Sequence, residues 1–134
     1  MRTMQVDVVT PDHKVFSEQA EMVVAEAAEG EIGILPGHTP FVSTLKIGPV
    51  RIKMAEHEQI AAVSGGFIEV HNDHVTILAE TAELPGDIDL ERARAAKERA
   101  ERRLERVRDD EIDFRRAELA LHRAMNRINV ANRR

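Results

Sequence analysis

Cysteine, tryptophan and tyrosine are absent from this 134-residue sequence, which also has only four phenylalanines. The absence of cysteine excludes a disulfide framework and cysteine-based metal sites, and it is compatible with a reducing compartment. Hydrophobic residues still make up 43% of the chain, so a core can form, but its side chains must be mainly aliphatic. The length suits one ordinary domain, or one small domain with an appendage.

Long hydrophobic runs are absent as well. No apolar run approaches the roughly 20 residues that a membrane-spanning helix requires, and residues 1–20 lack the apolar stretch of a secretory signal. We therefore expect a soluble protein that reaches a membrane only through a partner. The sequence also lacks the G-x-x-x-x-G-K-[ST] loop of nucleotide hydrolases and shows no nucleophile with a suitable partner, so we expect no catalytic activity.

Glycine and proline are missing from the C-terminal part of the chain. All seven glycines and all five prolines lie within residues 11–86, and the following 48 residues contain neither. That part is rich in Ala, Glu, Arg and Leu, a composition that favours helix. The Pro85-Gly86 pair therefore marks a boundary, and we predict two domains, residues 1–84 and residues 85–134.

Charge divides at the same boundary. Residues 1–84 carry 5 Lys and Arg against 13 Asp and Glu, a net charge of −8, whereas residues 85–134 carry 14 against 11, a net charge of +3. We expect the acidic part and the mildly basic part either to attract each other or to face different partners.

Hydrophobic residues before the boundary recur with a period of two, which is typical of half-buried strands. Further short β-branched runs lie near residues 22–28, 60–63 and 66–70, between turn signals that include residues 30–33. At Gly65-Gly66 we expect a close approach of two backbones. Many short strands at this spacing predict a β-sandwich or barrel. The alternating residues are Met4, Val6, Val8, Val50, Ile52, Met54, Val75, Ile77 and Ala79.

After the boundary the period changes to about 3.6, which predicts two amphipathic helices. Asp87 or Asp89 can cap the first helix, and residues 108–111 form a polar turn that can cap the second. The fold class predicted for the whole chain is α+β, an N-terminal β-sandwich followed by a C-terminal antiparallel two-helix hairpin. The apolar stripes are Leu90, Ala93, Ala96, Ala100, Leu104 and Val107, then Phe114, Ala117, Leu121, Ala124, Met125 and Ile128.

Four segments combine into a more specific pattern. They are V-T-P-D at 9–12, G-E-I-G-I-L-P-G-H-T-P at 30–40, A-V-S-G-G-F-I-E-V at 62–70 and V-T-I-L-A at 75–79. In this order, and followed by an Ala- and Arg-rich helical hairpin, they resemble the epsilon subunits of F-type ATP synthases. The resemblance covers essentially the whole chain, and residues 115–127 look most like the version found in Bacillus-type bacteria.

The resemblance implies a non-catalytic subunit of the central stalk at the cytoplasmic face of the cell membrane, peripheral and held there through the complex. Its β-sandwich would contact the gamma subunit and the ring of c subunits. Its helices would either fold against the sandwich or extend along gamma into the alpha/beta catalytic head, where they block ATP hydrolysis. Some bacterial members bind ATP as a regulatory ligand through an [IL]-D-x-x-R-A motif, and residues 88–93 (I-D-L-E-R-A) match that motif in full.

The residues themselves leave two interpretations of this motif open. One is a helix N-cap at Asp89 with an intrahelical ion pair, and the other is an anion site. Arg92 and Arg99 share a helix face, Arg123 and Arg127 share another, and four guanidinium groups in one place are unfavourable unless an anion lies between them. With the resemblance, the predicted ATP-binding residues are Glu83, Ile88, Asp89, Arg92, Ala93, Arg99, Arg123 and Arg127. A requirement for Mg²⁺ stays open.

Other functions are weighed against this one. The runner-up is a free-standing ATP-sensing module without a rotary partner. Nucleic-acid binding through the arginines of residues 99–106 is weaker, because glutamates are interleaved with them and the first domain is acidic. A metal site at His71-x-x-His74 lacks an acidic ligand at suitable spacing, so we predict no metal.

Overall fold

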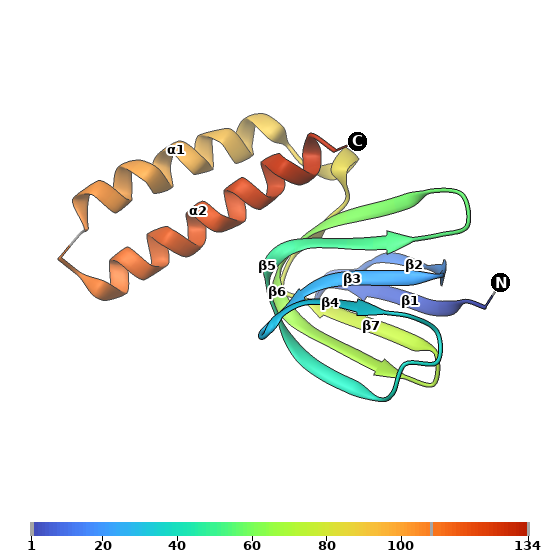
Figure 1. Ribbon diagram of the computed structural model, residues 1–134. Helices are drawn as coiled ribbons and strands as arrows, with labels where there is room; N and C mark the ends of the chain where they lie inside the picture. Colours follow the sequence, from blue (N-terminus) through green and yellow to red (C-terminus); the bar gives the residue numbers. More distant parts are fainter. Residues whose placement is uncertain (1, 108, 134) are drawn as a thin grey trace.

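The computed structural model describes residues 2–107 and 109–133, so Met1, Arg134 and Arg108 of the predicted interhelical turn lie outside the described residues. Within these ranges the chain forms eight strands, a short 3₁₀ turn and two helices (Figure 1). The strands are β1 (Met4–Val9), β2 (Lys14–Ala20), β3 (Met22–Ala27), β4 (Gly30–Ile34), β5 (Phe41–Lys53), β6 (Glu58–His71), β7 (His74–Ala79) and β8 (Ala82–Glu83). They are followed by η1 (Pro85–Asp87), α1 (Leu90–Arg106) and α2 (Glu111–Ala131).

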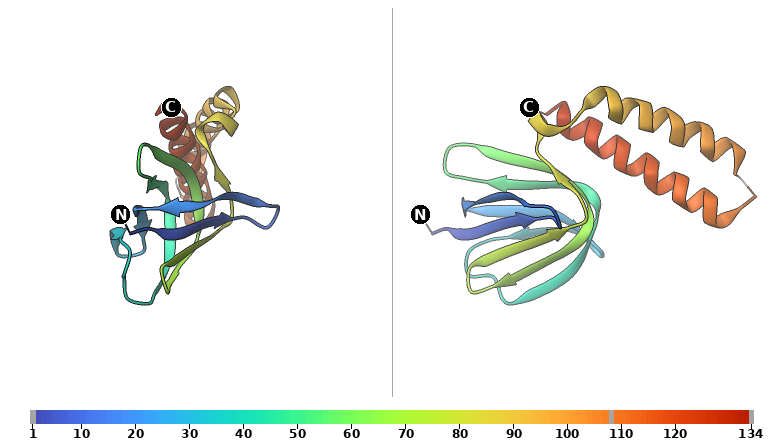
Figure 2. Two further views of the ribbon diagram at one scale, coloured as in Figure 1. Left: turned by 90° about the vertical axis from the view of Figure 1, so that its right-hand side faces the viewer. Right: turned by 180° about the vertical axis from the view of Figure 1, so that it is seen from behind.

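The strands form a sheet that folds over itself into a sandwich, which confirms the predicted fold class. Its order is β2-β1-β7-β6-β5-β3-β4, with β8 paired to β6, and it was not predicted from the sequence. The long strands β5 and β6 pair along almost their whole length and curve from one layer into the other (Figure 2). The pair β1–β7 is parallel, whereas β1–β2, β3–β5 and β6–β7 are antiparallel.

The core of this β-domain (residues 2–84) is aliphatic, as the composition predicts. The alternating residues of β1 and β7 are almost completely buried, and so are Val50 and Ile52 in β5, whereas Met54 is only partly buried. Phe16 is the one aromatic side chain in the main cluster of buried residues in the described chain.

Two strands occupy segments without a clear strand pattern. In β2 only Phe16 and Ala20 are buried, so the period of two is lost. Residues 30–33 were interpreted as a turn, and that interpretation is wrong, because they form β4 beside β3.

Strand β6 continues through Gly65-Gly66 instead of ending there. Gly66 has φ +127°, and a Cβ at this position would lie 2.0 Å from the backbone oxygen of Leu78 in β7. The expected close backbone approach at this pair is therefore confirmed.

Helices α1 and α2 pack along each other as an antiparallel hairpin, here called the arm (residues 85–133), which projects from the end of the β-domain opposite the N-terminus (Figures 1 and 2). Both helices have aspartate caps. The Asp89 Oδ1 accepts a hydrogen bond from Arg92 N at 3.0 Å, and the Asp110 Oδ1 accepts bonds from Ile112 N and Asp113 N, each at 3.1 Å. In the described residues no helix is long and apolar enough to cross a membrane.

The seam between the helices is lined by alanines, and the predicted stripe of α2 needs a correction. The seam includes Ala93, Ala100, Ala117 and Ala124, all at most 4% exposed. Phe114 and Met125 were placed in the stripe but are 37% and 41% exposed, because helices that meet through alanines approach closely and leave little room for large side chains. Asn126 and Val130 are buried near the C-terminal end of α2 instead.

Candidate functional site

A groove of about 740 Å³ lies between the β-domain and the arm. The left view of Figure 2 shows that the β1–β2 hairpin projects on the side of the molecule where α1 lies. The walls come from the β1–β2 turn, the segment from β7 to β8, the η1 turn and both helices. The lining residues are Thr10, Asp12, His13, Glu80, Thr81, Ala82, Glu83, Asp87, Asp89, Arg92, Ala93, Ala96, Arg99 and Arg127.

Six of the eight predicted site residues meet in this groove. The other two do not line it within the described part of the chain. Ile88 is 5% exposed and packs in an apolar cluster with Val130 and Ala131. Arg123 is half-buried on α2, one helical turn closer to the tip of the hairpin than Arg127. The six residues in the groove are Glu83, Asp89, Arg92, Ala93, Arg99 and Arg127.

Glu83 and Arg127 join the two parts of the molecule across the groove. The Arg127 Nε donates to Glu83 Oε1 at 2.5 Å, and Arg127 Nη2 lies 3.5 Å from Thr81 Oγ1. Both charged side chains are about one-quarter to one-third exposed, at 27% and 30%. A guanidinium group has five N–H donors, so this contact leaves Arg127 able to donate to a further anion.

The N-terminus of α1 forms another wall of the groove. Asp89 caps this helix by accepting a hydrogen bond from the backbone N–H of Arg92, so the predicted N-cap is confirmed, and the anion site at the same motif stays a prediction. Ala93 is buried and offers a small side chain where a larger residue would fill the groove. Arg92 and Arg99 are exposed two turns apart on the same side of α1, free to adjust to a ligand.

The turn between β1 and β2 contributes three lining residues that sequence reasoning missed, Thr10, Asp12 and His13. Thr10 fixes the turn, because its backbone N–H donates to the His13 carbonyl at 2.9 Å and its Oγ1 donates to the same oxygen at 3.2 Å. The only sequence signal was the V-T-P-D segment at 9–12, which contributed to the resemblance but indicated no contact with a helix 80 residues away.

Asp7 is the centre of a separate polar cluster on β1, β2 and β7. Its carboxylate accepts hydrogen bonds from Ser17 Oγ at 2.5 Å and from His74 Nε2 at 2.6 Å. Burial raises the pKa of Asp7, but the hydrogen bonds from Ser17, His74 and Gln5 and the charge of Lys14 outweigh burial and hold this pKa below its ordinary value. Since Ser17 and His74 both bind the carboxylate and not each other, the cluster is not arranged to activate a serine nucleophile.

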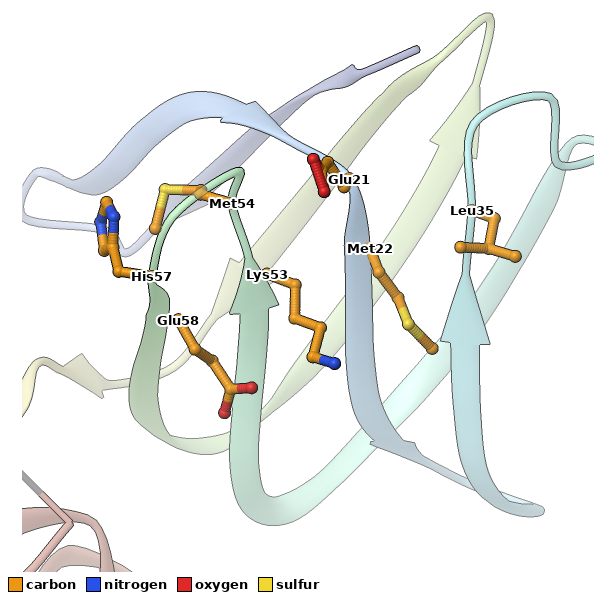
Figure 3. Close-up of a pocket in the computed structure, with 7 residues that line it drawn as sticks. All are labelled: Glu21, Met22, Leu35, Lys53, Met54, His57 and Glu58. Carbon is orange, nitrogen blue, oxygen red and sulfur yellow. The ribbon is translucent and has the colours of Figure 1, made fainter. Parts of the chain in front are cut away.

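A second hollow, of about 410 Å³, lies on the β-domain away from the arm (Figure 3). Met22 of β3 and Leu35, which follows β4, approach each other there, and Lys53 lies beside Met22. None of the predicted site residues lines this hollow. The described residues contain no cluster of His, Asp and Glu able to hold a metal ion, and the two histidines considered for one bind other groups, His74 binding Asp7 and His71 lying 3.1 Å from Asn72 Nδ2.

Comparisons with known proteins agree with the two-part architecture. Residues 3–85 match the family described as the beta-sandwich domain of the ATP synthase delta/epsilon chain, and residues 87–132 match its long alpha-helix domain. A solved structure titled as the mitochondrial ATP synthase of Euglena gracilis, OSCP/F1/c-ring, contains a chain with the same fold. The TM-score is 0.81 at 24% identity, over 97% of this chain and 81% of that chain.

Curated relatives are similar over their whole length. The ATP synthase epsilon chain of Halalkalibacterium halodurans is 57% identical over 99% of this chain and 100% of its own length. The epsilon chain of Bacillus velezensis is 56% identical over 98% of both chains, and that of Desulforamulus reducens is 52% identical over 97% of this chain and 98% of its own. With both family domains present in order, this chain belongs to the epsilon subunits of the F-type ATP synthases.

Proposed function

We propose that the chain is a non-catalytic coupling subunit whose arm inhibits ATP hydrolysis, and that ATP bound in the groove holds the arm docked on the β-domain. The observation that carries this proposal is the groove itself, where three arginines from two helices meet a β-domain wall. Phosphate groups match guanidinium donors in charge and geometry. A ligand there contacts both parts of the molecule, so it stabilises the docked arm.

The β-domain offers a surface for the stalk partners. Phe67 of β6 and Leu78 of β7 are paired across neighbouring strands and are 53% and 51% exposed. Val42 of β5, 68% exposed, is on the same face, diagonally across from Phe67. An exposed apolar patch of this kind is typical of a protein interface. We assign it to the gamma subunit, with the c-ring as further partner of the β-domain, at the cytoplasmic face of the membrane.

The energetics suit a ligand-controlled latch. A ligand that binds only the docked arm stabilises it by RT ln(1+[L]/Kd), about 2.7 kcal/mol at a hundredfold excess over Kd. The arm is held on the β-domain by a small apolar cluster and the Arg127–Glu83 contact, so a contribution of this size is enough to shift it from mostly released to mostly docked.

Calorimetric titration of the full chain with ATP, ADP and GTP tests ligand binding directly. Arg92→Ala removes a charged hydrogen bond to phosphate, worth about 1.5–3 kcal/mol, and we expect ATP binding to weaken at least tenfold. Arg102→Ala is the matched control, because Arg102 is exposed on the same helix and does not line the groove. Equal ATP affinities of the Arg92→Ala variant and the parent would show that the arginines only face solvent and do not bind ATP.

The inhibitory role is tested in the assembled ATP synthase. Fully extended as helix at ~1.5 Å per residue, the arm would span about 70 Å, enough to enter the catalytic head from its base. Removal of residues 88–134 is expected to raise ATP hydrolysis and leave synthesis nearly intact. If hydrolysis stays the same, the arm is not inhibitory.

The same assembly tests the alternative of a free-standing ATP sensor, which the family membership does not favour. A coupling subunit gains stability when it binds the gamma subunit, and substitution of Phe67 or Leu78 by serine weakens that gain. A free-standing sensor shows no such gain.

A further inference from the structure

The docked arm meets the sheet mainly through the end of α2, which packs against β5, β6 and η1. The apolar side chains at this contact form a small cluster. Apolar contacts have no preferred direction, so the cluster alone would tolerate a shift or rotation of the helix. Its members are Ile60, Ala62, Ile88, Val130 and Ala131, with Leu90 packed against them.

Asn126 is a polar residue on this buried face of α2. It is 8% exposed, and its Nδ2 donates a hydrogen bond to the backbone oxygen of Val63 in β6 at 3.2 Å. Docking removes water from both groups, and the hydrogen bond replaces that water only in this register. A helix shifted by one residue would bury the Asn126 amide without this acceptor, which is unfavourable.

The next residue along the helix is one of the groove arginines. Arg127 binds Glu83 at 2.5 Å and lines the groove. An α-helix has 3.6 residues per turn, so a rotation that moves Asn126 away from Val63 also moves Arg127 away from the groove. One polar contact in the docking face therefore sets the position of a charged side chain in the candidate ligand site.

We propose that Asn126 is a positioning residue, whose hydrogen bond to Val63 fixes the register in which the arm docks and thereby places Arg127 in the groove. A buried asparagine that selects one register among several apolar alternatives is a known device in coiled coils. The consequence for ATP binding rests on the proposed function, whereas the docking register itself does not need a ligand.

Docking can be measured without nucleotide, because the chain has no cysteine of its own and accepts two specific labels. Spin labels at Glu18→Cys and Glu111→Cys, both exposed, report the distance from β2 to the start of α2. Asn126→Leu keeps the branched shape of the side chain but removes the donor, and we expect the ratio of docked to released arms to fall roughly tenfold. Asn132→Leu, an exposed position at the end of the same helix, is expected to leave the ratio unchanged.

The Asn126→Asp variant supplies a signature that a space-filling role does not predict. At neutral pH its carboxylate has no proton to donate and faces the Val63 oxygen, so the arm is released. In acid the neutral carboxyl donates its O–H to the same oxygen, and the docked population is expected to recover. The parent is measured at each pH as reference, because other ionisable groups lie near this contact: Glu83 faces α2 from β8 and binds Arg127, and Arg123 lies one turn along the same helix.

The outcomes separate the two proposals. Unchanged docking in Asn126→Leu, or no recovery of Asn126→Asp in acid, overturns the role of Asn126. If Asn126→Leu fails to fold, seen as loss of the β-domain amide resonances, the acid series of Asn126→Asp decides alone. Calorimetry of the parent with ATP decides the proposed function independently, since a parent that does not bind ATP still shows whether Asn126 sets the docking register.

Discussion

The β-domain and the arm bury different kinds of side chain. The largest completely buried residues, among them Met4, Ile52 and Ile77, all lie in the β-domain. The arm buries mainly alanines, with Ile88 and Val130 as its largest buried apolar side chains. Burial of a large aliphatic side chain stabilises a fold by about 1.5–3 kcal/mol, and burial of a methyl group by less than about 1 kcal/mol. The β-domain is therefore a stable platform, and the arm is a part that can detach from it without global unfolding.

The type of polar contact differs in the same way. In the β-domain the polar groups of the Asp7 cluster bind one another within neighbouring strands. In the arm the two polar contacts that matter, Asn126 with Val63 and Arg127 with Glu83, cross from α2 to the β-domain. A few such contacts, each lost when the arm leaves, make docking sensitive to single substitutions and to ligands.

The largest effect is expected from a cavity in the β-domain core. Ile77 is completely buried in β7, and Ile77→Ala should lower the free energy of unfolding by about 2–5 kcal/mol. The matched change in the arm is Ala100→Gly, which removes a seam methyl group and should cost about 1 kcal/mol of helix stability. Urea unfolding followed by circular dichroism compares the two. Similar losses in both variants would contradict the division into platform and detachable arm.

A smaller effect is expected where the arm docks. Val130→Ala removes methyl groups from the cluster around Ile60, and about 1–2 kcal/mol of docking free energy should be lost. We expect faster amide hydrogen exchange in the arm and unchanged exchange in β5 and β6. Met125→Ala, at an exposed position of the same helix, is the control and should change neither rate. Equal acceleration in the β-domain would mean that the two parts unfold together.

The fold was predictable where one face of a strand or helix is buried. Val6 in β1 lies between polar neighbours, and Ile52 in β5 lies between charged ones, so the period of two is visible in the sequence. Strand β2 lacks this pattern because few of its side chains reach the core, and the glycines of β4 resemble turn residues. The strand order also stayed hidden, because it depends on pairings between distant segments such as β1 with β7.

Helix geometry predicts which residues share a face of one helix, and only that part of the groove could be predicted from the sequence. The spacing of Arg92 and Arg99 predicted that they share one face of α1 and therefore one wall of the groove. Arg123 was grouped with Arg127 by the same rule, yet four residues separate them by about 6 Å along the axis, and only Arg127 reaches the groove. His13 was missed because no local pattern links the β1–β2 turn to a helix.

The polar cluster gives the β-domain its own dependence on pH. The pKa of Asp7 in the folded chain is below its ordinary value, so its contribution to stability is present above the unfolded pKa, near 4. That contribution is lost as the pH falls through the lower, folded pKa. We expect Asp7→Asn to be less stable than the parent at pH 6, with a difference that shrinks in strong acid. Urea midpoints at several pH values measure this, with exposed Glu56→Gln as control.

The smallest effect is expected from substitution of His13, which tests whether a bound ligand contacts both parts of the molecule. His13 belongs to the β-domain but shares the groove with Arg92 and Arg99 of the arm. If ATP touches both walls, His13→Ala should weaken binding by roughly two- to fivefold, the range of an exposed charged contact. His71→Ala, exposed at the β6–β7 turn outside the groove, is the control. Equal ATP affinities of the His13→Ala variant and the parent would restrict the ligand to the arm and to Glu83, and the β1–β2 turn would then be only a boundary of the groove.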